Sequence, residues 1–498
     1  MTLVQNFPFF CIILSMFSAI ISFPMNHRWA MRVHLIMVTV VLALSLCVLG
    51  YTVSTGESYT FMMGHFPAPW GNEIRIGVLE ALMAVFFSLI MLLSVLGGLA
   101  HIGRELKNSR KNLFFILLDL LMSSLLALIY TNDLFTAYVF IEINTISACG
   151  LIMIKKEGRT YVSALRYMVM SLVGSSLFLI ALTLLYTITG QLLMTPAKEA
   201  LAELVAAGEY EVPILVIISL VTVGLGIKSG LYPFHTWIPD AYGYTTPSAS
   251  AILSSLVSKG YLFLLIKIFY RVLDFEFVVS SQVVNLLFML GILGMIMGSW
   301  LAIKTQNIRR MAAFSSVAQI GYIYMGIGLG TTAGVVAALF HIISHGAMKS
   351  LLFISISGLS EVSDDKSDFE SLKGAGFRNK LAGVAYTVGA MSMIGMPLLT
   401  GFISKYMFAS AATTAMQGKM VIAWIALAIS TILNTVYFMG SVLTIYHSVP
   451  AEQRKPHGMM PSRVESVGTV GLIALNVGLG VAATPVIQAI QTGLAIFG

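Results

Sequence analysis

Charged residues are scarce in this chain of 498 residues. Asp, Glu, Lys and Arg make up 10% of it, whereas hydrophobic residues make up 57%. A mean hydropathy of +0.89 excludes a soluble domain of this size. The apolar runs are much longer than the roughly 10-residue strands of a membrane barrel, which excludes that fold. No loop is long enough for a soluble catalytic domain, so any chemistry must occur inside the membrane or at its surfaces.

Cysteine is also nearly absent. Cys11, Cys47 and Cys149 lie in apolar stretches, and none forms a CxxC pair, so we expect buried, inert thiols. The sequence therefore predicts no iron–sulfur cluster, no other cofactor and no metal in this chain. The N-terminus, MTLVQNFPFF, has no basic segment and no small-residue cleavage site. We expect the first apolar stretch to be a retained helix rather than a signal peptide.

Long apolar stretches dominate the remaining sequence. A helix needs about 20 apolar residues to span the hydrocarbon core. The sequence therefore predicts an all-α polytopic membrane protein with about fourteen transmembrane helices. The predicted spans are 3–24, 33–53, 74–100, 113–131, 133–154, 162–189, 212–229, 248–270, 282–302, 308–329, 333–358, 382–397 continued by 401–416, 420–446 and 466–490.

Basic residues gather in alternate loops, and the loop at 190–211 is acidic. This positive-inside pattern explains the net charge of +7 as membrane topology, so nucleic-acid binding is not expected. The basic loops should face the cytoplasm, and both termini should lie on the outer side of the cytoplasmic (inner) membrane. The basic loop residues are Arg28, Arg32, Arg104, Lys107, Arg110, Lys111, Lys155, Lys156, Arg159, Lys304, Arg309, Arg310, Lys366, Lys373, Arg378, Lys380, Arg454, Lys455 and Arg463.

Two predicted helices, the seventh and the twelfth, are interrupted by glycine and proline. One break follows Gly226–Gly230, and the other lies at Gly395-Met396-Pro397. Broken helices survive at membrane depth only where protein or a wet cavity covers the freed backbone. A matching pair of breaks indicates two inverted five-helix repeats with a site near the midplane. The predicted units are N-terminal helices (1–112), a first repeat (113–270), a second repeat (282–446) and a cytoplasmic connector with the last helix (447–498).

Seven ionisable side chains lie within these apolar spans. Each would cost about 2.5–3.5 kcal/mol at the centre of a membrane on insertion scales. Such groups are functional candidates by default, and a line of them indicates the movement of charge. The seven are Glu142, Lys228, Lys259, His341, His345, Lys349 and Lys405.

Glu142 and Lys228 are expected to pair. Burial disfavours the charged form of a lysine and a nearby carboxylate favours it, so separating the two would release a proton. The alternative for Glu142 is a protonated carboxyl, or one hydrogen-bonded to a neighbouring helix. Lys259 is too deep in its helix to reach the interface, whereas Lys267, near the outer end, is expected to snorkel and to be structural.

His341, His345 and Lys349 are spaced i, i+4, i+8 and should share one helical face. Two histidines in this spacing suit a metal, but Lys349 would repel a cation, so a proton relay fits better. Lys405, just past the second break, is the expected outlet. Asp119 and Glu80 are possible additional ion-pathway carboxyls, although Asp119 could also be near the interface.

These residues resemble the signature of a known family. The stretch from Gly226 to Ala241, GIKSGLYPFHTWIPDA, together with Glu142, the His/Lys helix and the segment Gly395–Lys405, resembles proton-translocating antiporter-family subunits. The family includes subunits of Mrp-type Na+/H+ antiporters, antiporter-like subunits of complex I and membrane subunits of energy-converting hydrogenases. The stretch 66–71, FPAPWG, resembles an outer loop of the D subunit of Mrp-type antiporters. The resemblance implies two inverted five-helix repeats and a central hydrophilic axis with Glu142 and Lys228 as the switching pair.

The leading hypothesis is therefore an ion-translocating membrane subunit of a multisubunit complex that moves H+, with or without exchange for Na+. One alternative is a proton- or sodium-pumping subunit of a redox-driven respiratory complex. A quinone-binding oxidoreductase chain and a stand-alone carrier for an organic solute are further alternatives. The expected partners are other membrane subunits, the transported ions and the lipid bilayer.

Overall fold

A computed structural model describes residues 3–63, 66, 71–448, 450 and 462–497. Arg454 and Lys455, which carry part of the predicted basic connector, lie outside these residues. So does most of the loop motif at 66–71.

The first half of the chain is helical apart from one hairpin. Its elements are η1 (Leu3–Asn6), α1 (Phe7–Ser22), α2 (His27–Thr55), β1 (Tyr59–Met62), β2 (Glu73–Ile76), α3 (Val78–Glu105), α4 (Asn108–Tyr130), α5 (Leu134–Ile152), α6 (Gly158–Thr189), α7 (Met194–Ala206), α8 (Glu211–Ser229), η3 (Phe234–Trp237), α9 (Ile238–Tyr244), α10 (Pro247–Ile252), the π-helical turn η4 (Leu253–Val257) and α11 (Ser258–Arg271).

The second half is helical throughout its regular elements. They are α12 (Phe275–Ser280), α13 (Val283–Lys304), α14 (Ile308–Gly328), α15 (Thr332–Glu361), α16 (Ala375–Arg378), α17 (Lys380–Ile394), α18 (Thr400–Ala412), α19 (Gln417–Ile445), α20 (Arg463–Val481) and α21 (Ala483–Ala495).

Twelve helices within the described residues are long and apolar enough to cross a membrane. The chain is thus a multi-pass helical membrane protein, as predicted. Two predicted spans are not among the twelve. The span 308–329 corresponds to α14, which begins with two arginines. The broken span at 382–416 forms α17 and α18, which are 15 and 13 residues long.

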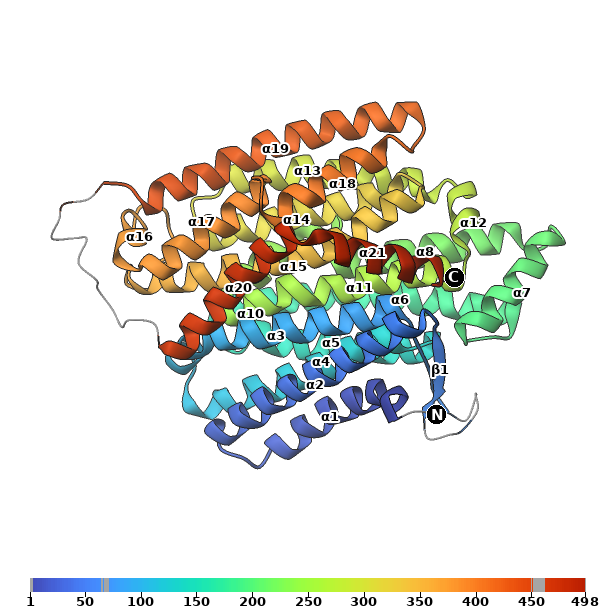
Figure 1. Ribbon diagram of the computed structural model, residues 1–498, viewed down its shortest axis with the longest axis horizontal. Helices are drawn as coiled ribbons and strands as arrows, with labels where there is room; N and C mark the ends of the chain where they lie inside the picture. The colour runs from blue at the N-terminus through green and yellow to red at the C-terminus, as the bar shows by residue number, and fades with distance from the viewer. Residues whose placement is uncertain (1–2, 64–65, 67–70, 449, 451–461, 498) are drawn as a thin grey trace.

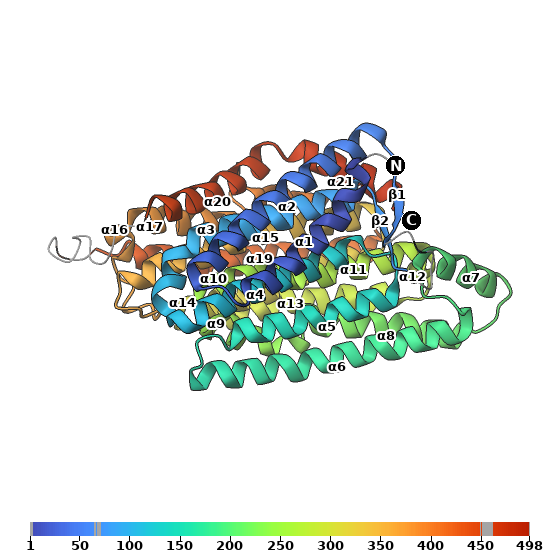
Figure 2. The ribbon, with the colours of Figure 1, turned by 90° about the horizontal axis from the view of Figure 1, so that it is seen from below.

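The long helices run side by side in a flattened bundle, with α1 and α2 at one edge and α19 at the other (Figure 1). The start of α1 and the end of α21 lie at the same end of the bundle, together with α7 and β1 (Figures 1 and 2). The opposite end carries α16. Helix α15 lies in the middle, and its residues from Gly334 to Ser360 are all buried.

Both predicted helix breaks are confirmed. Helix α8 ends at Ser229 because Gly230 adopts φ +84°, and α17 ends at Ile394 because Gly395 adopts φ +97°. These left-handed conformations favour glycine. Gly230 and Gly395 donate back to Gly226 and Met391, which satisfies the carbonyls freed at each break.

Several expectations about local structure were wrong. The acidic stretch 190–211 was expected to be a loop, but it contains α7, because Met194, Ala197 and Leu201 share one buried face. The predicted helix 466–490 is divided at Ala482. The predicted helix 74–100 begins only at Val78, because Glu73–Ile76 pairs antiparallel with Tyr59–Met62.

One cysteine also departs from expectation. Cys11 and Cys149 are buried, but Cys47 is exposed. Position 47 lies on the outer face of α2 with the exposed Leu46 and Val53, so its thiol faces outward from the bundle rather than into it.

Helices α13 and α14 approach each other unusually closely. A Cβ at Gly321 would lie 2.5 Å from the carbonyl oxygen of Gly291, and a Cβ at Gly291 would lie 2.4 Å from the amide nitrogen of Met325. Small residues at helix interfaces in membranes permit such backbone contact. This contact places the buried side chains of α14 against α15, where the candidate site lies.

Candidate functional site

The expected pair at the first break is present. Lys228, at the end of α8, has its Nζ 4.0 Å from Oε1 of Glu142 on α5. The same Nζ donates to Thr145 Oγ1 at 2.7 Å and lies 5.4 Å from the centre of the Tyr261 ring. The Lys228 side chain is fully buried, whereas that of Glu142 is 25% exposed. The carboxylate therefore lies at the edge of the bundle and the lysine lies inside it.

Lys259 occupies the first turn of α11, directly after the π-helical turn η4. Its side chain is buried, and its Nζ donates to the Ser254 carbonyl and, at 3.2 Å, to the Ser258 hydroxyl. The turn η4 and helix α11 both pack against α15, which carries His341, His345 and Lys349. The π-turn thus presents a first-half lysine to the central helix.

The two histidines of α15 stack on each other, as their spacing predicts. Their ring centres are 5.6 Å apart with planes inclined by 14°. Nδ1 of His341 lies 2.6 Å from Ser404 Oγ on α18, whereas neither ring nitrogen of His345 has a hydrogen-bond partner among the described residues. Clusters of three or more His, Cys, Asp or Glu able to hold a metal are absent from the part of the chain that the structure describes.

Lys349 lies one turn further along α15 and is also buried. Its Nζ donates to the Ala312 carbonyl at 2.6 Å and to Ser315 Oγ at 2.5 Å, both on α14. The ammonium group of Lys349 is therefore hydrogen-bonded to two neutral oxygens.

Lys405 lies in α18, beside the second break. Its Nζ donates to the carbonyl of Ile394 at 2.7 Å and to Thr431 Oγ1 at 3.1 Å. It lies 5.8 Å from the centre of the Tyr322 ring, which stacks on His341. The seven predicted residues thus lie on five helices, α5, α8, α11, α15 and α18. We call these seven residues the lysine axis.

Neutral polar side chains connect parts of this axis. Ser350 on α15 bonds to both Ser94 and Ser255, at 2.9 and 2.8 Å. Ser344 bonds to Thr400 at 2.7 Å. These residues were not predicted, because serine and threonine are common in transmembrane helices and their partners lie far away in the chain.

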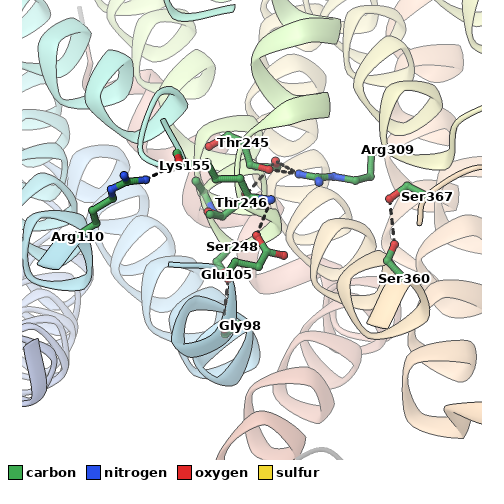
Figure 3. A network of polar contacts seen from close by, with 12 residues as sticks. Gly98, Glu105, Arg110, Lys155, Thr245, Thr246, Ser248, Arg309, Ser360 and Ser367 are labelled. Carbon is green, nitrogen blue, oxygen red and sulfur yellow. Dashed lines mark hydrogen bonds and ion pairs between the residues drawn. The ribbon is translucent and has the colours of Figure 1, made fainter. Parts of the chain in front are cut away.

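A second polar network ties the helix ends together at the end of the bundle that carries the basic loops (Figure 3). Arg309 donates to the carbonyl of Thr245, between α9 and α10. Glu105 pairs with Lys155 at 2.8 Å, and Arg110 donates to the Lys155 carbonyl at 2.5 Å. Arg309 was predicted only as a marker of topology, yet it joins the start of α14 to the segment that follows the first break.

The two additional carboxyls each have a partner that was not predicted. Asp119 lies 2.5 Å from Nδ1 of His34, and Oε1 of Glu80 lies 2.5 Å from Nη2 of Arg271. Oε2 of Glu80 also accepts the Gly77 amide at the start of α3. The Asp119 side chain is fully buried within the protein.

Lys267 was expected to snorkel to the outer interface, and this was wrong. Its side chain is buried, and its Nζ donates to the carbonyls of Leu128, Ile129 and Thr131. The carbonyls freed where α4 ends provide acceptors inside the bundle, so the ammonium group does not need to reach water.

Fold and site together define a polytopic helical membrane protein with broken helices and a buried series of lysines and histidines. The chain matches the family model described as "NADH:quinone oxidoreductase/Mrp antiporter, TM" over residues 131–432, and it belongs to this family. It is 32% identical to NADH-quinone oxidoreductase subunit N of Desulforudis audaxviator, over 89% of this chain and 87% of that protein. It is 25% identical to the D subunit of the Na(+)/H(+) antiporter of Alkalihalophilus pseudofirmus, over 86% and 83%.

Two solved structures share the fold. One is a chain of the membrane-bound sulfane sulfur reductase, an archaeal respiratory membrane complex, with a TM-score of 0.86 and 24% identity. The other is a chain of the Mrp complex from Dietzia sp. DQ12-45-1b, with a TM-score of 0.86 and 22% identity. Each match covers 99% of this chain and 97% of the other.

Proposed function

We propose that this chain translocates protons along the lysine axis as one membrane subunit of a multisubunit antiporter, in which H+ movement is coupled to Na+ movement. The observation that carries the proposal is the pairing of the buried Lys228 with Glu142 beside a helix break. Membership of the antiporter family and similarity to antiporter D subunits support the multisubunit context.

The proposed mechanism starts at the first break. While Glu142 is close, its carboxylate favours the charged form of Lys228; when α5 and α8 move apart, the lysine loses that support and releases its proton. Lys259, His345, His341 and Lys349 pass charge between the two halves, and Lys405 is the outlet. Imidazole suits the relay role because it accepts and donates protons near neutral pH.

A transport assay on Glu142→Gln and Lys228→Ala variants tests this proposal. Both should abolish ion movement in complexes that assemble normally, because each removes one member of the switching pair. Lys198→Ala is the matched control, because Lys198 lies on α7, outside the lysine axis, where it donates to the Tyr270 carbonyl and pairs with Asp274. Wild-type transport in both switch variants would refute the mechanism.

A second candidate is a proton- or sodium-pumping subunit of a redox-driven respiratory complex. It is favoured by the similarity to NADH-quinone oxidoreductase subunit N. Copurification separates the two: redox subunits would identify a respiratory complex, whereas small membrane subunits alone would identify an antiporter.

The proposed topology places the chain in the cytoplasmic membrane with the basic loops inside and both termini outside. The proposed units are helices 1–112, an inverted pair of repeats over 113–270 and 282–446, and the terminal segment 447–498. The two glycine-terminated breaks, at Ser229 and Ile394, support the pairing of the repeats.

A further inference from the structure

His34 and Asp119 form an ion pair apart from the lysine axis. His34 lies on α2 and Asp119 on α4, with Nδ1 and Oδ1 2.5 Å apart and both side chains fully buried. The imidazole also packs against Phe115, at 5.7 Å between ring centres. Neither residue pairs with any other charged group among the described residues.

In each side chain of the His34–Asp119 pair, only one of the two polar atoms has a hydrogen-bond partner among the described residues. Nε2 of His34 and Oδ2 of Asp119 are buried without a hydrogen-bond partner among the described residues. A buried ion pair stabilises a fold only when good geometry and additional hydrogen bonds offset its desolvation. The Glu80–Arg271 pair has additional bonds, because Glu80 accepts the Gly77 amide and Arg271 donates to the Phe497 carbonyl, although Nη1 of Arg271 has no partner among the described residues. His34 and Asp119 lack such bonds, so a purely structural role explains them poorly.

Helix α1 packs against both α2 and α4, the two helices that carry the pair. Helix α1 buries Cys11, Ser15, Ser18 and Ser22 on one face, spaced i, i+4, i+7, i+11. Helices α2 and α4 add further buried polar residues, and two of them, Ser45 and Tyr130, have hydroxyls without a partner among the described residues. We call these groups the N-terminal polar seam. The seam comprises Cys11, Ser15, Ser18, Ser22, His34, Ser45, Asp119, Ser123 and Tyr130.

We propose that His34 and Asp119 are a proton-binding site, separate from the lysine axis, within the N-terminal polar seam. Imidazolium beside carboxylate is a neutral pair, and loss of the shared proton leaves a net negative charge on Asp119. Sodium is a hard ion that takes several oxygen ligands. The pair offers one carboxylate and an imidazole nitrogen, which suits a proton.

Other titratable groups lie on the helices packed against α2 and α4, and α11 contributes Lys259, Tyr261, Lys267, Tyr270 and Arg271. Helix α1 contributes only Cys11, and α3 contributes Glu80 in its first turn and His101, Arg104 and Glu105 near its end. Helix α4 adds Arg110, Lys111 and Tyr130, α5 adds Tyr138, Glu142 and Cys149, and α2 itself adds His27, Arg28, Arg32, Cys47 and Tyr51. Within ion-pairing distance, the described residues offer His34 only Asp119.

The test uses the intact complex carrying Asp119→Asn, His34→Gln or the double change His34→Leu with Asp119→Leu. Thr39→Val on the exposed face of α2 is the control. Infrared difference spectra after a pH step should show a shift of the Asp119 carboxylate band as the neighbouring imidazolium loses its proton; this signal should be lost in Asp119→Asn and altered in His34→Gln. The pH profile of transport should shift in all three variants and remain unchanged in Thr39→Val.

The double leucine variant keeps the proposal falsifiable, because apolar replacement of a buried ion pair is often neutral or stabilising. The proposal is wrong if the double leucine variant assembles and transports with the wild-type pH profile and the wild type shows no infrared shift of the Asp119 carboxylate. The pair then has only a structural role. If every variant fails to assemble, the fold requires the pair and the proposal is overturned. Only the transport readout rests on the proposed function; the infrared band reports proton binding even if the complex moves no ions.

Discussion

Lys405 bridges the second helix break: its Nζ lies 2.7 Å from the carbonyl oxygen of Ile394, the last residue of α17. The residue proposed as the outlet thus also satisfies a carbonyl that the break sets free. Any movement of this lysine is therefore tied to the backbone at the break.

Lys405→Met should abolish transport while the complex still assembles, because methionine keeps the apolar stem but has no proton to carry. The measurement is ion transport in reconstituted vesicles. Lys419→Met is a close control, since Lys419 also donates to a helix-terminal carbonyl, that of Gly328, at 2.7 Å. If both variants lose transport equally, the contact of the lysine with a helix-terminal carbonyl, rather than proton transfer by Lys405, would explain the loss.

Ser404→Ala should slow transport, because it removes the partner of His341 Nδ1. One hydrogen bond contributes about 0.5–1.5 kcal/mol, which corresponds to a roughly 2- to 10-fold lower rate. Ser404→Thr should restore the rate by restoring the hydroxyl, and Ser410→Ala on the exposed side of α18 should have no effect. If Ser404→Ala transports at the wild-type rate, the hydrogen bond that orients His341 does not contribute to transport.

Gly321→Ala should destabilise the protein, since the new Cβ would lie 2.5 Å from the Gly291 carbonyl oxygen. Overpacking of this kind costs about 1–3 kcal/mol. Thermal unfolding of the purified complex measures it. Gly440→Ala on α19 is the control, because a Cβ there meets nothing within 4 Å and alanine favours the helix. Gly321→Ala should therefore lower the unfolding temperature of the complex, and Gly440→Ala should leave it unchanged or raise it.

Asp368, in the loop after α15, gives a prediction for pH. Its Oδ2 accepts the Ser371 amide at 2.9 Å and the Ser371 hydroxyl at 2.8 Å, and these bonds lower the pKa of Asp368 below its usual 3.8. The two bonds from Ser371 therefore stabilise the folded loop fully above pH 3.8, and this stabilisation is lost as the pH falls through the lowered pKa of Asp368.

Hydrogen exchange at the Ser371 amide provides the measurement. Its protection should remain constant from neutral pH down to about 3.8, the usual Asp pKa, and decline below it. Asp368→Asn should reduce protection at neutral pH, whereas Glu370→Gln, which changes an exposed carboxyl next to it, should not. If the Ser371 amide of Asp368→Asn is as well protected as in the wild type, the charge of Asp368 contributes nothing to the stability of this turn.

The sequence predicted those features whose cause is local. Gly230 and Gly395 mark the two breaks because glycine accepts a left-handed backbone that other residues disfavour. The pairing of Glu142 with Lys228 followed from the cost of leaving either charge alone in a membrane.

Features set by distant partners escaped prediction. The π-helical turn at Leu253–Val257 contains neither glycine nor proline, so nothing local marks it. His34 was overlooked because its partner, Asp119, lies 85 positions further along the chain. Lys267 was misjudged because the carbonyls that hold it belong to the end of another helix.

The lysine axis contains one carboxylate, Glu142, and four lysines, all of which donate to neutral oxygens. Two charges about 10 Å apart at an effective dielectric constant of about 20 repel by roughly 1.7 kcal/mol. A charge on one lysine therefore disfavours a charge on its neighbour. In the proposed mechanism, a proton captured at one end of the axis would then lower the proton affinity of the next lysine, so the two ends would be coupled before any single proton had travelled the full distance.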